Sequence, residues 1–278
     1  MRTRRSVVAV RSAERVSSSV SLHRSQHRHM PRTLEVPLDS LAAAILAAPF
    51  ADRLELCDDL PSEGWTPTPA LIAAARERID PGRTTIVSMI RPRSANNSAA
   101  LDVAAFTTTP RILGDSLREI EASAKAGAHS VAIGLLTADG HVDMEACAQM
   151  RDVARDHGMI VAFLRSFDLL ADRKRGMDDI TALGMTRVVT AGVLGWDASV
   201  LTLAERIAVL AADLKNAKAA ALTHGTSAVE VVPGGGVRAS NAREFLTVSP
   251  HLHASCRRDG TISPAELTEL RSVLSGSD

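Results

Sequence analysis

The sequence predicts a single (β/α)8 TIM barrel of the α/β class. Eight short strand segments, each followed by a helical segment, can be counted from Thr33 onward. They fill one continuous run of about 245 residues, close to the ~250 residues typical of this fold. Several of the strand segments are almost wholly apolar, as parallel strands buried on both faces should be. A doubly wound open sheet is the structural alternative.

The first half of the chain alternates strands and helices. Thr68 and Pro69 form an N-cap and N1 pair that opens one helix, and Gly127 is typical of the residue that follows a helix end. A long polar loop, Arg91–Pro110, interrupts the alternation. The expected elements are strand Thr33–Val36, helix Leu38–Ala48, strand Asp52–Cys57, helix 68–79, strand Thr84–Ile90 and helix 111–126.

The second half continues the same order. Gly158 and Gly184 indicate two further helix ends, and Ser263 with Glu266 forms a capping-box pattern at the start of the last helix. The expected elements are strand Val131–Gly134, helix Asp143–His157, strand Ile160–Phe163, helix 174–183, strand Val188–Thr190, helix Val200–Ala221, strand Val229–Val232, helix Ala239–Leu246, strand His251–Cys256 and the last helix.

Residues 1–29 differ in composition from the rest of the chain. They contain seven Arg, seven Ser and three His, and Glu14 is their single acidic residue. Such a charged, aperiodic segment offers no apolar face to a core. We therefore expect residues 1–32 to be a disordered basic tail, with Met30 as a candidate translation start, and residues 33–278 to form the barrel domain.

Composition excludes several functional classes. The formal net charge is zero, which argues against a nucleic-acid binder that relies on phosphate neutralisation. No apolar run approaches the ~18 residues needed to span a bilayer. Three widely spaced cysteines suit a reducing compartment better than a disulfide framework. The sequence thus predicts a cytoplasmic protein with no membrane partner, and leaves a homo-oligomer open.

A glycine triplet follows the seventh expected strand. Gly234, Gly235 and Gly236 precede Arg238, and in this fold the loops after strands seven and eight commonly bind anions. Glycines let backbone N–H groups approach a ligand, and an arginine adds a fork of donors. We interpret this loop as an anion-binding site, although a plain structural turn would carry the same glycines.

Polar residues at the ends of the other strands should meet at one mouth of the barrel. Arg91, Arg165 and Arg238 are expected to bind an anion there, with Ser255, whereas Arg93 and Asp168 are expected to be paired at the rim. The full set is Glu35, Glu55, Cys57, Arg91, Arg93, Asp139, His141, Arg165, Asp168, Arg238, His253, Ser255 and Cys256.

An ordered set of motifs resembles the CutC copper-homeostasis family from about Leu34 to Leu274. The motifs are Ala51–Cys57, Gly64–Pro67, Ile90–Arg93, Asp139–Asp143, Phe163–Asp168, Gly235–Arg238 and His253–Ser255. The resemblance implies a cytoplasmic TIM barrel linked to copper tolerance and proposed to bind copper. It implies no established enzymatic reaction.

The chain departs from that family where soft ligands would be expected. Val36, Pro37 and Leu38 stand where the family has cysteines after its first-strand glutamate, and Leu164 replaces a histidine on strand five. A polar, alanine-rich stretch, Ser94–Thr109, replaces an aromatic and acidic loop. Each change removes a ligand from the mouth.

Two functional hypotheses remain. Copper(I) prefers thiolate, thioether and imidazole ligands, so a copper-binding protein would use Cys57, His253 and Cys256, although buried thiols also serve simply as core. An enzyme, or a degenerate enzyme, would instead hold a small phosphorylated or carboxylated metabolite with Arg91, Arg165 and the Gly234–Arg238 loop. Glu35 or Glu55 would then be its general acid–base.

Overall fold

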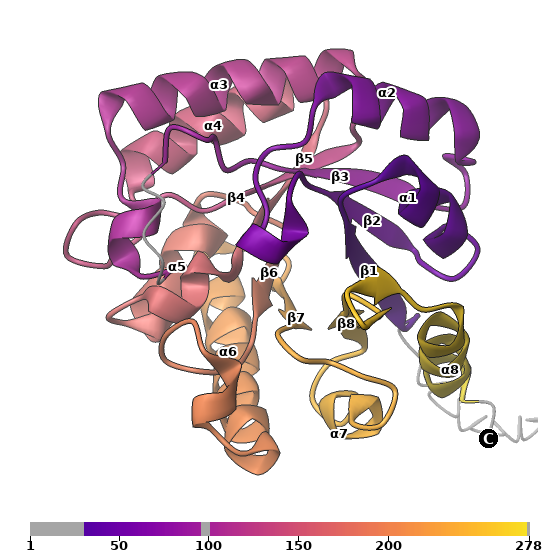
Figure 1. The fold of residues 1–278 in the computed structure, drawn as a ribbon. Helices are drawn as coiled ribbons and strands as arrows, with labels where there is room; N and C mark the ends of the chain where they lie inside the picture. The colour runs from indigo at the N-terminus through magenta and orange to yellow at the C-terminus, as the bar shows by residue number, and fades with distance from the viewer. Residues whose placement is uncertain (1–30, 96–100, 277–278) are drawn as a thin grey trace, which may run out of the picture. The chain divides into compact units, whose positions relative to one another are not determined.

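Eight parallel strands form the wall of a nearly closed barrel (Figure 1). The computed structural model describes residues 31–95 and 101–276, so most of the expected tail lies outside the described residues. The strands follow one another around the sheet in sequence, apart from β8, which pairs with β1. This order confirms the TIM barrel and excludes the open sheet. The strands are β1 (Thr33–Leu38), β2 (Arg53–Leu56), β3 (Thr85–Met89), β4 (Ser130–Ile133), β5 (Ile160–Phe163), β6 (Arg187–Thr190), β7 (Glu230–Pro233) and β8 (His251–His253).

The seam between β7 and β8 is joined by a side chain. Within the described residues no backbone ladder links these two strands. The buried Ser249 hydroxyl donates to the Val231 carbonyl at 2.6 Å and accepts from His251 N–H at 3.1 Å. A serine therefore closes the barrel where strand pairing does not.

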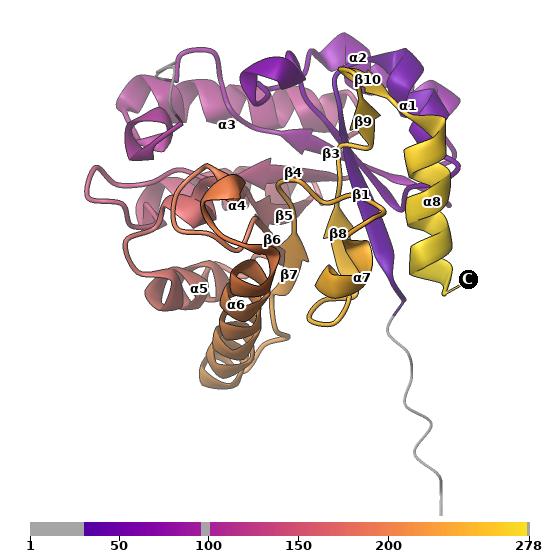
Figure 2. The same ribbon diagram turned by 60° about the horizontal axis from the view of Figure 1, so that its bottom comes forward.

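Helices cover the outside of the barrel (Figure 2). Thr68, Thr109 and Thr202 each accept a backbone N–H as N-caps. In the described part of the chain, no helix is long and apolar enough to cross a membrane. The α-helices are α1 (Leu41–Ala47), α2 (Pro69–Arg78), α3 (Pro110–Lys125), α4 (Met144–Asp156), α5 (Arg173–Ala182), α6 (Leu203–His224), α7 (Ala242–Phe245) and α8 (Pro264–Ser275). Short 3-10 turns are η1 (Leu60–Ser62), η2 (Val103–Phe106), η3 (Arg165–Leu169) and η4 (Ala198–Val200).

Three predicted helices begin three residues later than expected. Thr202 is the N-cap of α6, which begins at Leu203 and not at Val200. At the other two, a side chain just before the helix binds a backbone N–H group. β1 continues to Leu38, and Ser40 accepts Ala43 N–H to start α1 at Leu41. Asn241 accepts the backbone N–H of Arg238 at 2.9 Å and so delays α7.

The capping box expected at Ser263 forms only in part. Ser263 accepts Glu266 N–H at 3.3 Å, but the Glu266 carboxylate does not reach back to it. Instead Glu266 accepts the Ala239 N–H at 2.7 Å and pairs with Arg258. The carboxylate thereby ties the loop after β7 to α8.

A hairpin that we did not predict follows β8. Strands β9 (Arg257–Arg258) and β10 (Thr261–Ile262) pair in antiparallel fashion. Their turn is Asp259-Gly260, and both residues have positive φ. An Asp-Gly pair is a strong hairpin signal, so the sequence contained the information. This hairpin places Gly260 beside the barrel mouth.

The barrel interior is apolar on one side and charged on the other. Val87, Ala132, Ala162 and Leu164 form a small buried cluster inside the barrel, separate from the main core between sheet and helices. On the opposite side, strands β1, β2, β6 and β8 bury a cluster of charged side chains that pair with one another. The mouth therefore offers both kinds of surface to a ligand.

Candidate functional site

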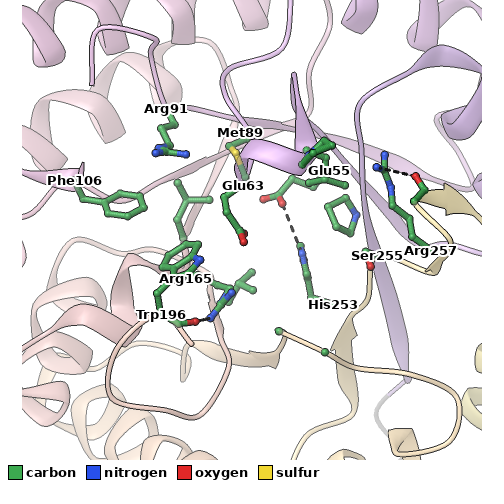
Figure 3. Close-up of a pocket in the computed structure, with 18 residues that line it drawn as sticks. Glu55, Glu63, Met89, Arg91, Phe106, Arg165, Trp196, His253, Ser255 and Arg257 are labelled. Atoms are coloured by element: carbon green, nitrogen blue, oxygen red, sulfur yellow. Dashed lines mark hydrogen bonds and ion pairs between the residues drawn. The ribbon is translucent and has the colours of Figure 1, made fainter. Parts of the chain in front are cut away.

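A cavity of about 470 Å³ opens at the mouth of the barrel (Figure 3). Its walls come from the C-terminal ends of the strands and the loops beyond them, as expected for this fold. The lining residues are Pro37, Glu55, Leu60, Pro61, Glu63, Met89, Arg91, Phe106, Leu164, Arg165, Val189, Trp196, Gly235, Gly236, His253, Ser255, Arg257 and Gly260.

Glu35 lies beneath this cavity at the centre of a buried charge network. Its carboxylate is 2.8 Å from Arg53 Nε and 3.2 Å from Arg187 Nε, and it accepts from His253 Nδ1 at 3.0 Å. Burial alone would raise its pKa, but Arg187, His253 and Arg53 together hold the pKa well below its usual range. Glu35 is therefore a permanent carboxylate that orients His253.

Glu55 and His253 face each other in the cavity wall. Glu55 Oε2 lies 3.8 Å from His253 Nε2, and Glu55 Oε1 has no hydrogen-bond partner among the described residues. Burial, aided by the charge of Glu35, raises the pKa of Glu55 to about 7. Burial lowers the pKa of His253, but Glu35 and Glu55 outweigh that effect and raise it overall.

This arrangement suits proton transfer at neutral pH. Of the two predicted acid–base residues, Glu55 has a pKa near neutral pH and lines the cavity. Glu35 has a pKa well below neutral and is not part of the lining. Two carboxyl groups with pKa values pushed apart by their surroundings are a common basis of acid–base assignments. Because Glu55 and His253 interact, they titrate as a coupled pair, and the apparent pKa values describe the pair rather than either residue alone.

Arg91 is a buried cation with unused donors. The residue is only 3% exposed, and its guanidinium carbon lies 4.1 Å from the centre of the Trp65 ring. Nη1 donates to the Gly64 carbonyl at 3.0 Å, but Nε and Nη2 have no hydrogen-bond partner in the described residues. Burial lowers its pKa despite the nearby charge of Glu63. A buried guanidinium with unmet N–H groups favours an anionic ligand.

Arg165 lines the same cavity, but its charge is already compensated. Its Nε lies 3.3 Å from Asp168, and its Nη2 donates to the Trp196 carbonyl at 2.7 Å. Its guanidinium also stacks 4.4 Å from the Trp196 ring. Asp168 is therefore paired as predicted, but it is buried and does not lie at the rim, and the Arg165 charge is paired rather than free for an anion as expected. Arg93 pairs with Asp58 at the rim, as predicted.

The glycine loop contributes backbone groups to the cavity. Gly235 and Gly236 line it with positive φ, and their N–H groups have no partner in the described part of the chain. Gly234 instead donates to Thr190 at 2.8 Å and continues the strand pairing. Arg206, which the sequence analysis missed, donates to the carbonyls of Gly234 and Gly235 at 2.8 and 2.7 Å. It thereby holds the loop in place.

Arg238 lies outside the cavity lining. Its Nη1 donates to the Val237 carbonyl at 3.0 Å and to Ser255 Oγ at 3.5 Å. Ser255 itself lines the cavity. The predicted anion-binding set is therefore divided. Gly234 and Arg238 do not line the cavity. The members that do line it are Arg91, Arg165, Gly235, Gly236 and Ser255. Asp139 and His141, beyond strand four, are also absent from the lining.

The three predicted copper ligands do not form a metal site in this arrangement. Cys57 and Cys256 are fully buried, and neither lines the cavity. Burial raises the pKa of both thiols, that of Cys256 to about 12, so both are protonated. His253 is engaged with two carboxyl groups. Among the described residues, no three His, Cys, Asp or Glu side chains are grouped to hold a metal ion. The donors therefore do not fit copper(I), which prefers thiolates.

Several site residues were missed by sequence reasoning. Arg53 and Arg187 were not recognised as partners of Glu35, although the alternation of β2 places Arg53 on the same face as Glu55. Glu63 and Trp196 lie in loops without a motif. No local signal indicates that they reach the mouth.

Known proteins share this fold and sequence pattern. A CutC family protein from Chromobacterium violaceum is 32% identical over 231 residues, which covers 82% of each chain. The human copper homeostasis protein cutC homolog is 29% identical over 227 residues, covering 81% of this chain and 73% of its own. The crystal structure of CutC from Streptococcus agalactiae superposes with a TM-score of 0.67 at 24% identity, covering 81% of this chain and 98% of that one.

A more distant structure shares the fold alone. It is 3-keto-L-gulonate-6-phosphate decarboxylase from Vibrio cholerae, with a TM-score of 0.54 and 13% identity over 89% of this chain and 99% of its own. The sequence model of the CutC family, by contrast, matches residues 32–257. That range includes every strand of the barrel and the cavity residues up to Arg257. The chain therefore belongs to the CutC family.

Proposed function

We propose that this protein serves copper homeostasis in the cytoplasm by acting on a small carboxylated or phosphorylated metabolite, rather than by coordinating copper through thiolates. The names of its relatives support the copper connection. The three free cysteines, all buried, support a reducing compartment. The polar groups of the cavity support the metabolite.

One observation carries the proposal. The same cavity of about 470 Å³ contains a buried arginine with unmet donors, Arg91, and an acid–base pair, Glu55 with His253. An unpaired buried cation is unfavourable unless an anion joins it. A carboxyl group whose pKa is about 7 can either give or take a proton at neutral pH. A ligand anchored by its anion would therefore lie beside a proton-transfer group.

The roles of the residues follow from these contacts. Arg91 and the N–H groups of Gly235 and Gly236 would bind the anionic group of the ligand. Glu55 would transfer a proton to or from the bound molecule. His253 would stabilise the ionised form of Glu55 through Nε2. Glu35 would keep the imidazole oriented by accepting a hydrogen bond from His253 Nδ1.

The proposal is tested by calorimetric titration with inorganic phosphate, small sugar phosphates and small carboxylic acids. Arg91→Met keeps the bulk of the side chain and removes its donors. It should weaken binding about 10- to 100-fold, the size of a hydrogen bond to a charged group. Arg93→Met is the matched control, because Arg93 is 60% exposed and already paired with Asp58. The control should bind as the wild type does.

Turnover provides a second readout for any acid or phosphate that binds. Glu55→Gln cannot transfer a proton, so it should retain binding and lose the reaction. Absence of binding by the wild type, or equal affinities in the Arg91 and Arg93 variants, would refute the proposal.

A further inference from the structure

The unpaired charges of the cavity are one cation and one anion. Arg165 is compensated by Asp168, and Arg257 by Asp39. The Glu55 carboxyl group lies 3.8 Å from the His253 imidazole and interacts with it. The remaining charged side chains of the lining are Arg91 and Glu63. The Glu63 carboxylate has no ion pair or hydrogen bond to any described residue, although its charge acts on Arg91.

Glu63 is held next to Arg91 by the backbone around it. Arg91 Nη1 donates to the Gly64 carbonyl at 3.0 Å and to the Ser62 carbonyl at 3.4 Å, so it grips the residues on both sides of Glu63. Glu63 itself has a φ of 65°, a left-handed conformation that is unfavourable for residues other than glycine. Such conformations persist where the surroundings impose them, often at ligand sites.

The side chain of Glu63 extends into the cavity. Figure 3 shows it pointing into the open space bounded by Arg91, Glu55 and Arg165. Arg91 and Glu63 thus present a positive and a negative group to the same cavity, where the charge of Glu63 acts on Arg91. Apolar side chains face the same space, among them Met89, Phe106 and Leu164.

From this juxtaposition we infer that the ligand of the proposed function is a zwitterion of the α-amino acid type with an apolar side chain. Its carboxylate would bind Arg91, and its ammonium group would bind Glu63. In an α-amino acid these two charges are separated by a single carbon, which suits two opposite charges that face one cavity. A phosphate dianion would meet repulsion from Glu63 in the same place.

The inference rests on the proposed function, and matched ligands separate the two. Leucine, methionine and phenylalanine are each compared with the deaminated acid and the decarboxylated amine of the same side chain, by calorimetry at neutral pH. The α-amino acid should bind about 10-fold or more tightly than either analogue, because each analogue lacks one charge-assisted hydrogen bond.

Glu63→Gln then tests the role of the carboxylate. This variant should lose the preference for amino acids over deaminated acids, and should bind deaminated acids at least as well as the wild type. Glu77→Gln, an exposed α2 residue that does not line the cavity, controls for the change in net charge and should keep the preference.

The outcomes distinguish the two ideas. Deaminated acids or sugar phosphates that bind the wild type as tightly as amino acids do would overturn this inference and leave the proposed function standing. A preference that survives in Glu63→Gln would also overturn it. If the wild type binds no carboxylate, amino acid or phosphate, both fail together.

Discussion

Replacing Glu55 with glutamine should make the protein more stable at alkaline pH relative to the wild type. The folded-state pKa of Glu55 is about 7, against its usual value of 4.5, because the side chain is buried. The folded protein therefore prefers the protonated carboxyl. The stability from this preference is fully present below the unfolded-state pKa and is lost as the pH rises through the folded-state pKa. Glutamine resembles the protonated form and does not titrate.

The size of the effect follows from the two pKa values. Each unit of difference between the folded and unfolded states corresponds to about 1.4 kcal/mol. Between about pH 5 and pH 8, ionisation of Glu55 should lower the free energy of unfolding of the wild type by about 2–3 kcal/mol. The difference between Glu55→Gln and the wild type should grow by the same amount, in favour of the variant. The titration of His253 belongs to the same pair and is part of the measured difference.

Urea unfolding followed by circular dichroism measures this difference at a series of pH values. Glu77→Gln removes a carboxylate that is exposed, so its difference from the wild type should stay nearly constant with pH. If the Glu55→Gln difference is also independent of pH, the pKa of Glu55 is not raised and the acid–base assignment loses its basis. A difference that shrinks as pH rises would show that burial of the ionised form is favourable.

Two further predictions concern metal binding and the glycine loop. In competition with a tight Cu(I) chelator, the protein should retain copper only weakly, because the Cys57 and Cys256 thiols are buried and protonated. Stoichiometric copper that is still bound in Cys57→Ser would show that other ligands bind it. Gly235→Ala should lower the free energy of unfolding by about 2–4 kcal/mol, from a positive φ and from a Cβ placed 2.8 Å from Ala191 Cβ. Gly260→Ala has a positive φ but open space, so its loss in thermal or urea unfolding should be about 1–2 kcal/mol; equal losses would contradict crowding at Gly235.

The order of elements was predictable because it depends on local patterns. Apolar strands that alternate with capped helices can bury themselves on both faces only in a few folds, and the length of the run favours the barrel. The barrel, in turn, implies that strand ends meet at one mouth. That reasoning correctly brought Glu55, Arg91, Arg165 and His253 to a common cavity. Its local errors arose where side chains bind backbone groups, either nearby, as Asn241 does with Arg238, or far along the chain, as Glu266 does with Ala239.

The chemistry of the mouth depended on pairings that no local pattern contains. Glu35 and Glu55 look equivalent in the sequence, each a glutamate on an early strand. The fold places Glu35 between Arg53 and Arg187, which keep it ionised, and leaves Glu55 buried without an arginine in ion-pair contact. Burial and neighbouring charge act in opposite directions on a carboxyl pKa, so opposite roles result.

The arginines show the same division. Arg165 has its carboxylate three residues away in Asp168, although the sequence analysis expected Arg165 to bind an anion. Arg91 has no such partner, and its unmet donors become visible only when the aromatic rings and loop carbonyls around it are in place. The sequence alone determined the barrel and some of the strand-end residues that reach its mouth, but not the loop residues Glu63 and Trp196. Only the tertiary structure decided which of their charges remain unpaired, because pairing depends on contacts between strands and loops far apart in the chain.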